Sequence, residues 1–199
     1  SYGELTPAEP GERRALDGVT QKAETRRELD RGWLGDSAKL HWLFLEPVLD
    51  NDHGQTFDLL QRYLDWALYE ELRLKHGVSY GPYTQRETFG DTGVMSLNAD
   101  LDRADLKEAE QALGNMLDRL RKNGLDPATF ARIKQAAIDR EAWTTQGNSA
   151  LADYYWGALN DYLDGRFSDP ARTLRRVSLE DANQALKQLL AKPGYVRVE

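Results

Sequence analysis

The chain contains no cysteine among its 199 residues. Disulfide bonds, thiolate zinc sites and a cysteine nucleophile are therefore excluded. This absence does not identify a compartment, because cysteine-free proteins occur in both the cytosol and the periplasm. The chain opens with Ser1 instead of Met and shows no signal peptide, so we expect a piece of a longer protein.

Long apolar runs and an excess of positive charge are also missing. The most apolar stretch, residues 40–49, is broken by His41, Glu46 and Pro47 and is far shorter than the roughly 20 residues of a membrane-spanning helix. The formal net charge is -7. A basic surface for phosphate backbones is therefore not expected, and we predict no nucleic-acid partner.

Histidine is scarce, with only His41, His53 and His76 in the whole chain. Helical zinc sites pair histidines a few positions apart, as in H-E-x-x-H and H-x-x-E-H, and neither motif is present. We therefore predict no metal or other cofactor in this chain and expect structural or solvent-exposed histidines. Nucleophile-elbow, Walker and dinucleotide motifs are missing too, and no pair of carboxylates stands out as catalytic.

The apolar pattern divides the chain into two parts. Residues 1–38 have little periodicity and many glycines and prolines, which predicts a linker or lead-in with room for one edge strand. Residues 39–199 are predicted to form one domain. Strands are predicted at 39–49, 78–89, 93–101 and 195–199, and helices at 54–75, 102–122, from 126, at 149–163, from 169 and from 178. This order predicts an α+β fold, with a mostly antiparallel sheet and helices packed on one face.

The helix predicted at 54–75 has an unusually wide apolar surface. Tyr63, Trp66 and Tyr69 broaden its leucine-rich stripe beyond the usual arc of about 100°. Neighbouring helices or a partner domain are therefore expected to cover the excess. Gly77 follows directly after the helix and suits a left-handed end.

Residues 72–80 read LRLKHGVSY, which resembles the L-R-x-K-x-G-x-x-Y signature of the insulinase-like zinc proteases (pitrilysin or M16 family). The signature belongs to their C-terminal, metal-free domain, and the matching residues are Leu72, Arg73, Lys75, Gly77 and Tyr80. The context is similar as well, because a long helix, a glycine turn, a hairpin and several helices follow in the family's order over residues 38–199. The family's Gly/Ser-rich stretch before the signature is absent from residues 60–69.

The resemblance implies a mechanism that needs two homologous α+β halves closing into a chamber. The partner half carries zinc on a paired-histidine motif (H-x-x-E-H or H-E-x-x-H). This half supplies Arg73 and Tyr80, which hold the backbone and carbonyl oxygen of a peptide substrate. The resemblance thus implies a chain that is inactive alone, binds the metal-bearing half in cis or in trans, and serves a metallopeptidase. The family's habit favours a bacterial periplasm, with the cytoplasm as the alternative.

Other interpretations of the same residues stay open at this point. Arg73 suits the C-terminal end of a helix, where a cation favours the macrodipole. Tyr80 suits a strand aromatic in the core. The same fold could also serve as a non-catalytic assembly subunit or as a stand-alone peptide-binding module.

Overall fold

The computed structural model describes residues 26–29, 34–46, 54–89, 92–144, 147–161, 170–192 and 194–199. Five strands in these residues form one sheet in the order β1-β5-β2-β4-β3. Only the β1–β5 pair is parallel, so the sheet is mostly antiparallel. The strands are β1 (Arg26–Glu28), β2 (Ser37–Leu45), β3 (Tyr83–Phe89), β4 (Thr92–Asp102) and β5 (Tyr195–Val198).

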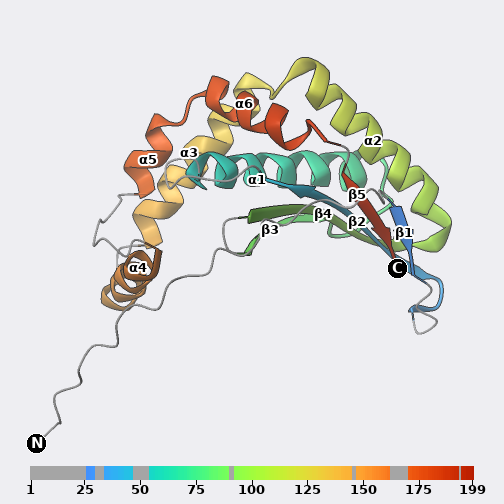
Figure 1. Ribbon diagram of the computed structural model, residues 1–199, viewed down its shortest axis with the longest axis horizontal. Helices are drawn as coiled ribbons and strands as arrows, with labels where there is room; N and C mark the ends of the chain where they lie inside the picture. Colours follow the sequence, from blue (N-terminus) through green and yellow to red (C-terminus); the bar gives the residue numbers. More distant parts are fainter. Residues whose placement is uncertain are drawn as a thin grey trace, which may run out of the picture.

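Most helices lie to one side of the sheet, and the helix of residues 148–161 lies beyond the end of the sheet (Figure 1). A central helix, α1 (Gly54–Tyr69), continues into a π-helical turn, η2 (Glu70–Lys75). The others are η3 (Arg103–Asp105), α2 (Leu106–Asn123), α3 (Pro127–Thr144), α4 (Asn148–Asp161), α5 (Pro170–Arg176) and α6 (Leu179–Leu189). The predicted α+β class, with helices on one face of a mostly antiparallel sheet, is confirmed.

The sheet is amphipathic because side chains on neighbouring strands alternate in step. Leu40 of β2 lies opposite Ala99 of β4, and Phe44 lies opposite Met95. Directly opposed residues project to the same face of a sheet. All four side chains are buried, so this face forms the core under the helices.

Helix α1 is the centre of the helical layer. It packs on β3 and β4 and is contacted by α3, α5 and α6 (Figure 1). The Tyr63 hydroxyl accepts a hydrogen bond from the Asp126 backbone N–H at 2.8 Å. The guanidinium of Arg132, on α3, lies 4.6 Å from the centre of the Trp66 ring. Neighbouring helices therefore cover much of the wide apolar surface that the sequence predicts for this helix.

Two predicted helix starts are confirmed by their caps. Ser178 Oγ accepts a hydrogen bond from the Asp181 backbone N–H, and the Asp181 carboxylate accepts one from the Ser178 N–H, which forms a capping box. Asp126 Oδ1 accepts a hydrogen bond from the Thr129 N–H at 2.8 Å ahead of α3. Both caps satisfy N–H groups that have no partner within the helix.

The strand expected from residue 78 is wrong at its start, because β3 begins only at Tyr83. The N–H groups of Val78 and Ser79 both point at the Leu72 carbonyl oxygen, at 3.0 and 3.4 Å. They therefore close the helix end and are not free to form a ladder. A single bridge from Ser79 to Leu101 ties this turn to β4.

The remaining boundaries agree closely with the expectations. β2 begins at Ser37, two residues earlier than predicted, and β1 lies within the predicted lead-in. The expected end of the strand at 39–49 and of the helix at 149–163 fall outside the described residues.

Candidate functional site

Arg73 and Tyr80, the two residues singled out in the sequence, lie in contact. Arg73 is on η2 and Tyr80 is in the turn that leads to β3. The guanidinium carbon of Arg73 lies 4.5 Å from the centre of the Tyr80 ring, which is a cation–π contact. Tyr80 is 83% exposed. The alternative in which Tyr80 is a core aromatic is therefore wrong.

The backbone between these two residues is fixed by its own hydrogen bonds. His76 N–H donates to the Glu71 carbonyl at 3.2 Å, an i to i+5 bond that widens the last helical turn. Gly77 then adopts φ +70°, a left-handed conformation that suits glycine. The Ser79 hydroxyl donates to the Asp100 carbonyl at 2.7 Å. Hydrogen bonds thus hold the turn to both the helix and β4, and Arg73 and Tyr80 stand at the two ends of this turn.

A cavity of about 500 Å³ adjoins the Arg73–Tyr80 pair. It lies between the turn, the start of β2 at Ser37–Lys39 and the end of β4 at Asp100–Asp102. Lys39 Nζ is 3.1 Å from Asp100 Oδ1 across its wall. The pair therefore brings a guanidinium and a phenol to the mouth of a cavity. Both groups can donate hydrogen bonds to an oxygen that carries negative charge.

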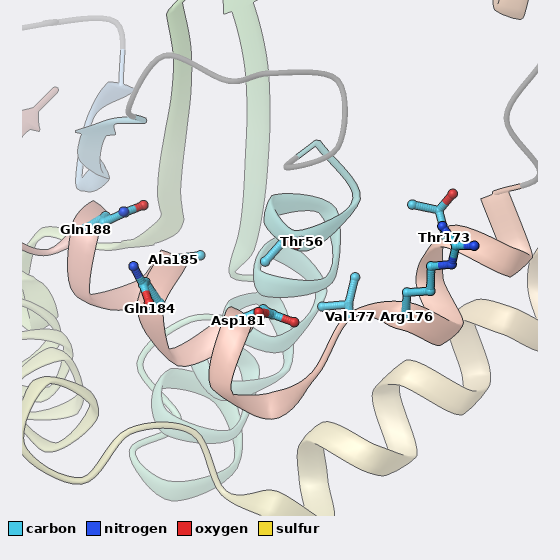
Figure 2. Close-up of a pocket in the computed structure, with 8 residues that line it drawn as sticks. All are labelled: Thr56, Thr173, Arg176, Val177, Asp181, Gln184, Ala185 and Gln188. Atoms are coloured by element: carbon cyan, nitrogen blue, oxygen red, sulfur yellow. The ribbon is translucent and has the colours of Figure 1, made fainter. Parts of the chain in front are cut away.

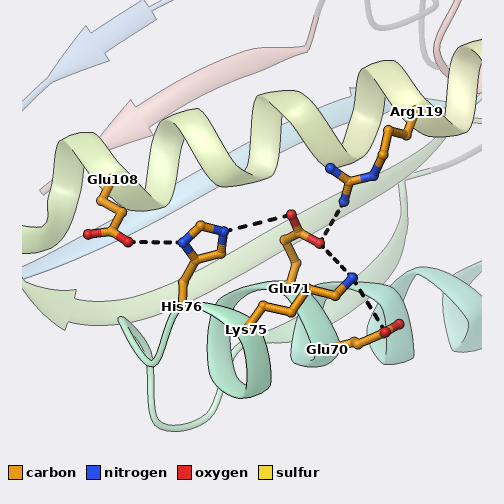
Figure 3. A network of polar contacts seen from close by, with 6 residues as sticks. All are labelled: Glu70, Glu71, Lys75, His76, Glu108 and Arg119. Atoms are coloured by element: carbon orange, nitrogen blue, oxygen red, sulfur yellow. Dashed lines mark hydrogen bonds and ion pairs between the residues drawn. The ribbon is translucent and has the colours of Figure 1, made fainter.

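Two positions before Arg73, a nearly buried carboxylate connects η2 to α2 (Figure 3). The Glu71 side chain is 5% exposed, and its Oε2 lies 2.6 Å from Arg119 Nη2 and 3.2 Å from Lys75 Nζ. Burial alone raises the pKa of Glu71, but the hydrogen bonds from Arg119 and Lys75 outweigh burial, so this pKa lies below its usual value. The sequence analysis missed this residue, because its main partner is 48 positions away.

The histidines that the structure describes serve as hydrogen-bonding links. His76 Nδ1 lies 2.9 Å from Glu108 Oε1 on α2, and His76 Nε2 lies 3.9 Å from Glu71 Oε1 (Figure 3). His41 Nδ1 lies 2.8 Å from Asn98 Oδ1 across β2 and β4. His53 lies outside the described residues. Within the described part of the chain, no three His, Asp or Glu side chains gather in a way that could hold a metal ion.

A second buried carboxylate lies at the opposite end of β2. Glu46 contacts Arg86 Nε at 2.9 Å, and Arg86 Nη1 lies 2.6 Å from Asp58 Oδ1. Burial raises the pKa of Glu46 above its usual value, and the Arg86 guanidinium offsets only part of this effect. In the sequence Glu46 only interrupts an apolar run, so its pairing could not be predicted.

A second cavity, of about 450 Å³, lies between the start of α1 and the α5–α6 corner (Figure 2). Arg176 and Asp181 are the charged residues of its lining, and Asp181 already caps α6. Its other lining residues are Thr56, Thr173, Val177, Gln184, Ala185 and Gln188. This lining offers no pair of groups with a chemical role comparable to Arg73 and Tyr80.

The structure thus defines an α+β domain with a mostly antiparallel sheet, and its described residues gather no metal ligands. The family model of the Peptidase M16 inactive domain matches residues 3–137. The chain belongs to this family, and the resemblance found in residues 72–80 is confirmed. Among curated proteins, no sequence matches the chain.

Solved structures share the fold at low sequence identity. The periplasmic protease PqqL from Escherichia coli superposes with a TM-score of 0.71 at 14% identity, over 90% of this chain and 20% of that one. A peptidase M16 inactive domain from Pseudomonas fluorescens gives 0.70 at 18% identity, over 92% of this chain and 45% of that one. The inactive peptidase domain of a proposed zinc protease from Bordetella parapertussis gives 0.68 at 16% identity, over 82% and 92%.

The chain therefore spans a fifth of PqqL and under half of the Pseudomonas fluorescens protein, but nearly all of the Bordetella parapertussis domain. None of the helices in the described residues combines the length and the apolar character that crossing a bilayer requires.

Proposed function

We propose that this chain is the metal-free half of a zinc metalloendopeptidase, in which it binds and positions a peptide for a metal-bearing half. The observation that carries this proposal is the exposed Tyr80 ring stacked against Arg73 at the mouth of a cavity. A phenol and a guanidinium that converge on one cavity, on a turn fixed by hydrogen bonds, can bind and orient a ligand.

The chemistry of the pair suits peptide hydrolysis at a metal ion. Negative charge develops on the substrate carbonyl oxygen in the transition state, and fixed donors that meet this charge accelerate the reaction. Arg73 can hold the peptide backbone, while the Tyr80 hydroxyl can reach the carbonyl oxygen. The zinc and the paired-histidine motif belong to the other half, so the chain is inactive alone.

The partner and the compartment are part of the same proposal. PqqL is much longer than this chain and is a periplasmic protease. We infer that the chain joins a metal-bearing half, in cis or in trans, and that the two halves together hydrolyse peptides in the periplasm. The Arg73–Tyr80 surface then faces the zinc of that half.

The experiment measures peptide turnover by the intact protease, with this chain and the metal-bearing half present. Arg73→Ala and Tyr80→Phe are each expected to lower turnover by on the order of 10²–10³, the usual effect of losing one oxyanion donor. Tyr83→Phe is the matched control, because Tyr83 is also an exposed tyrosine near the start of β3.

Turnover within twofold of wild type for both Arg73→Ala and Tyr80→Phe would refute the substrate-binding role and favour an assembly subunit. A second measurement addresses the partner directly. The chain and the metal-bearing half should elute together in gel filtration at micromolar concentration with peptide present. Separate elution under these conditions would favour a stand-alone peptide-binding module.

A further inference from the structure

We propose that Glu71 is a positioning residue for Arg73. Its carboxylate, held by Arg119 of α2, fixes the orientation of the π-helical turn that carries Arg73 to Tyr80 and the cavity. The effect on peptide turnover rests on the proposed function, whereas the effect on the Arg73–Tyr80 geometry does not.

Glu71 and Arg73 lie on opposite sides of the same short turn. Side chains two positions apart on a helix point in different directions, because two residues cover roughly half a turn. The Glu71 carboxylate faces α2 and is 5% exposed (Figure 3). Arg73 faces the Tyr80 ring at 4.5 Å. Glu71 thus binds the turn to α2, and Arg73 presents its guanidinium to Tyr80.

Two contacts, one of which is made by Glu71, hold η2 to α2 at separate points. Arg119 contacts Glu71, and Glu108 contacts His76 at the end of the same turn (Figure 3). Glu108 and Arg119 are eleven positions apart on α2, about three turns and roughly 16 Å along one face. Two contacts at this spacing resist both rotation and tilting of η2 against α2.

The burial of Glu71 makes its contact with Arg119 the dominant one. A carboxylate removed from water is costly unless a cation and hydrogen bonds accompany it. Lys75 also contacts Glu71, but at 3.2 Å compared with 2.6 Å for Arg119, and its ammonium group is shared with Glu70 at 3.4 Å. Arg119 is the cation that links this carboxylate to another helix.

The contact between Glu71 and Arg119 stabilises the widened turn. The i to i+5 bond from His76 to Glu71 replaces the tighter α-helical pattern just where Arg73 emerges. Single π-helical turns occur frequently at functional sites, and they change the direction of the side chains that follow. Without the Glu71 anchor, we expect this turn to relax and Arg73 to leave the Tyr80 ring.

The first test uses the whole chain and NMR, with no protease activity involved. The side-chain protons of Arg73 that lie above the Tyr80 ring should show a ring-current shift in their NMR resonances. The Tyr80→Leu variant should abolish this shift, which assigns the shift to the Tyr80 ring. Glu71→Gln should remove most of this shift. Glu46→Gln is the matched control, because it also removes a buried carboxylate paired with an arginine, but at the other end of β2.

Arg119→Gln serves as a second variant if Glu71→Gln fails to fold, since Arg119 is half exposed. It should reduce the ring-current shift, and Arg119→Lys should restore part of it. An unchanged shift in Glu71→Gln, or in Arg119→Gln where Glu71→Gln does not fold, would overturn the proposal.

The second test is a double-mutant cycle in the intact protease. Glu71→Gln should lower kcat/KM about tenfold in wild type and have no further effect when Arg73 is already alanine. Equal losses in both backgrounds would show a general structural role and overturn the proposal. If Arg73→Ala itself leaves kcat/KM unchanged, the proposed function fails, and the NMR result alone decides the role of Glu71.

Discussion

The guanidinium of Arg73 stacks on the ring of Tyr80 at 4.5 Å, although seven positions separate the two residues and Tyr80 is 83% exposed. The contact depends on a helix that stops and a chain that reverses within four residues. Single substitutions can therefore test the end of the helix and the reversal of the chain separately.

Gly77→Ala should destabilise the chain by about 1–2 kcal/mol, because its φ of +70° is unfavourable for any residue with a Cβ. No atom lies within 4 Å of the place a Cβ would occupy, so the cost comes from the backbone alone. Urea denaturation measures it. Gly81→Ala is the control, since Gly81 has the same free space without a positive φ. Equal stability of the two variants would contradict the left-handed turn.

Leu72→Ala should cost about 2–5 kcal/mol, because Leu72 is fully buried and its truncation leaves a cavity. Leu74→Ala, two residues further, should change the free energy of unfolding by less than about 0.5 kcal/mol, because Leu74 is 59% exposed. Thermal or urea unfolding of both variants checks the orientation of the π-helical turn. Similar losses for both would mean that this turn is oriented differently.

The two buried glutamates should give opposite dependences of stability on pH. The pKa of Glu71 lies below its usual value, so its carboxylate stabilises the folded state above about pH 4.3, the ordinary glutamate pKa. The stability of wild type relative to Glu71→Gln should therefore be constant near neutrality and decrease as the pH falls through the folded pKa.

For Glu46 the sign is reversed, because burial raises its pKa in the folded state. Wild type should lose stability relative to Glu46→Gln as the pH rises from about 4.3 through that raised pKa. Urea unfolding from pH 3 to pH 7 measures both trends. Curves of the same sign for the two variants would show that their environments are not as described.

The chain alone should bind no zinc tightly and cleave no peptide, because its histidines are too far apart in sequence for a helical zinc motif. Elemental analysis after dialysis against a weak chelator should show well under one zinc per chain. Stoichiometric zinc that disappears when His41 and His76 are both replaced would refute this expectation.

The sequence by itself determined the elements and their order. The leucine periodicity and Gly77 place a helix at 54–75, because both signals act within a few residues along the chain. The same holds for the cap at Ser178 and for the alternation of buried residues in β4. The resemblance at residues 72–80 also pointed to Arg73 and Tyr80, although no local signal shows that their side chains touch.

Only the tertiary structure decided which distant groups meet. Glu71 finds Arg119 because α2 packs alongside η2, and Glu46 finds Arg86 because β2 and β3 flank β4 in one sheet. In the sequence these residues look like ordinary charged residues, because the pattern of one helix or strand does not show which other element packs against it. The late start of β3 also became visible only in the structure, where Val78 and Ser79 bond to Leu72 and Ser79 pairs with Leu101 of β4.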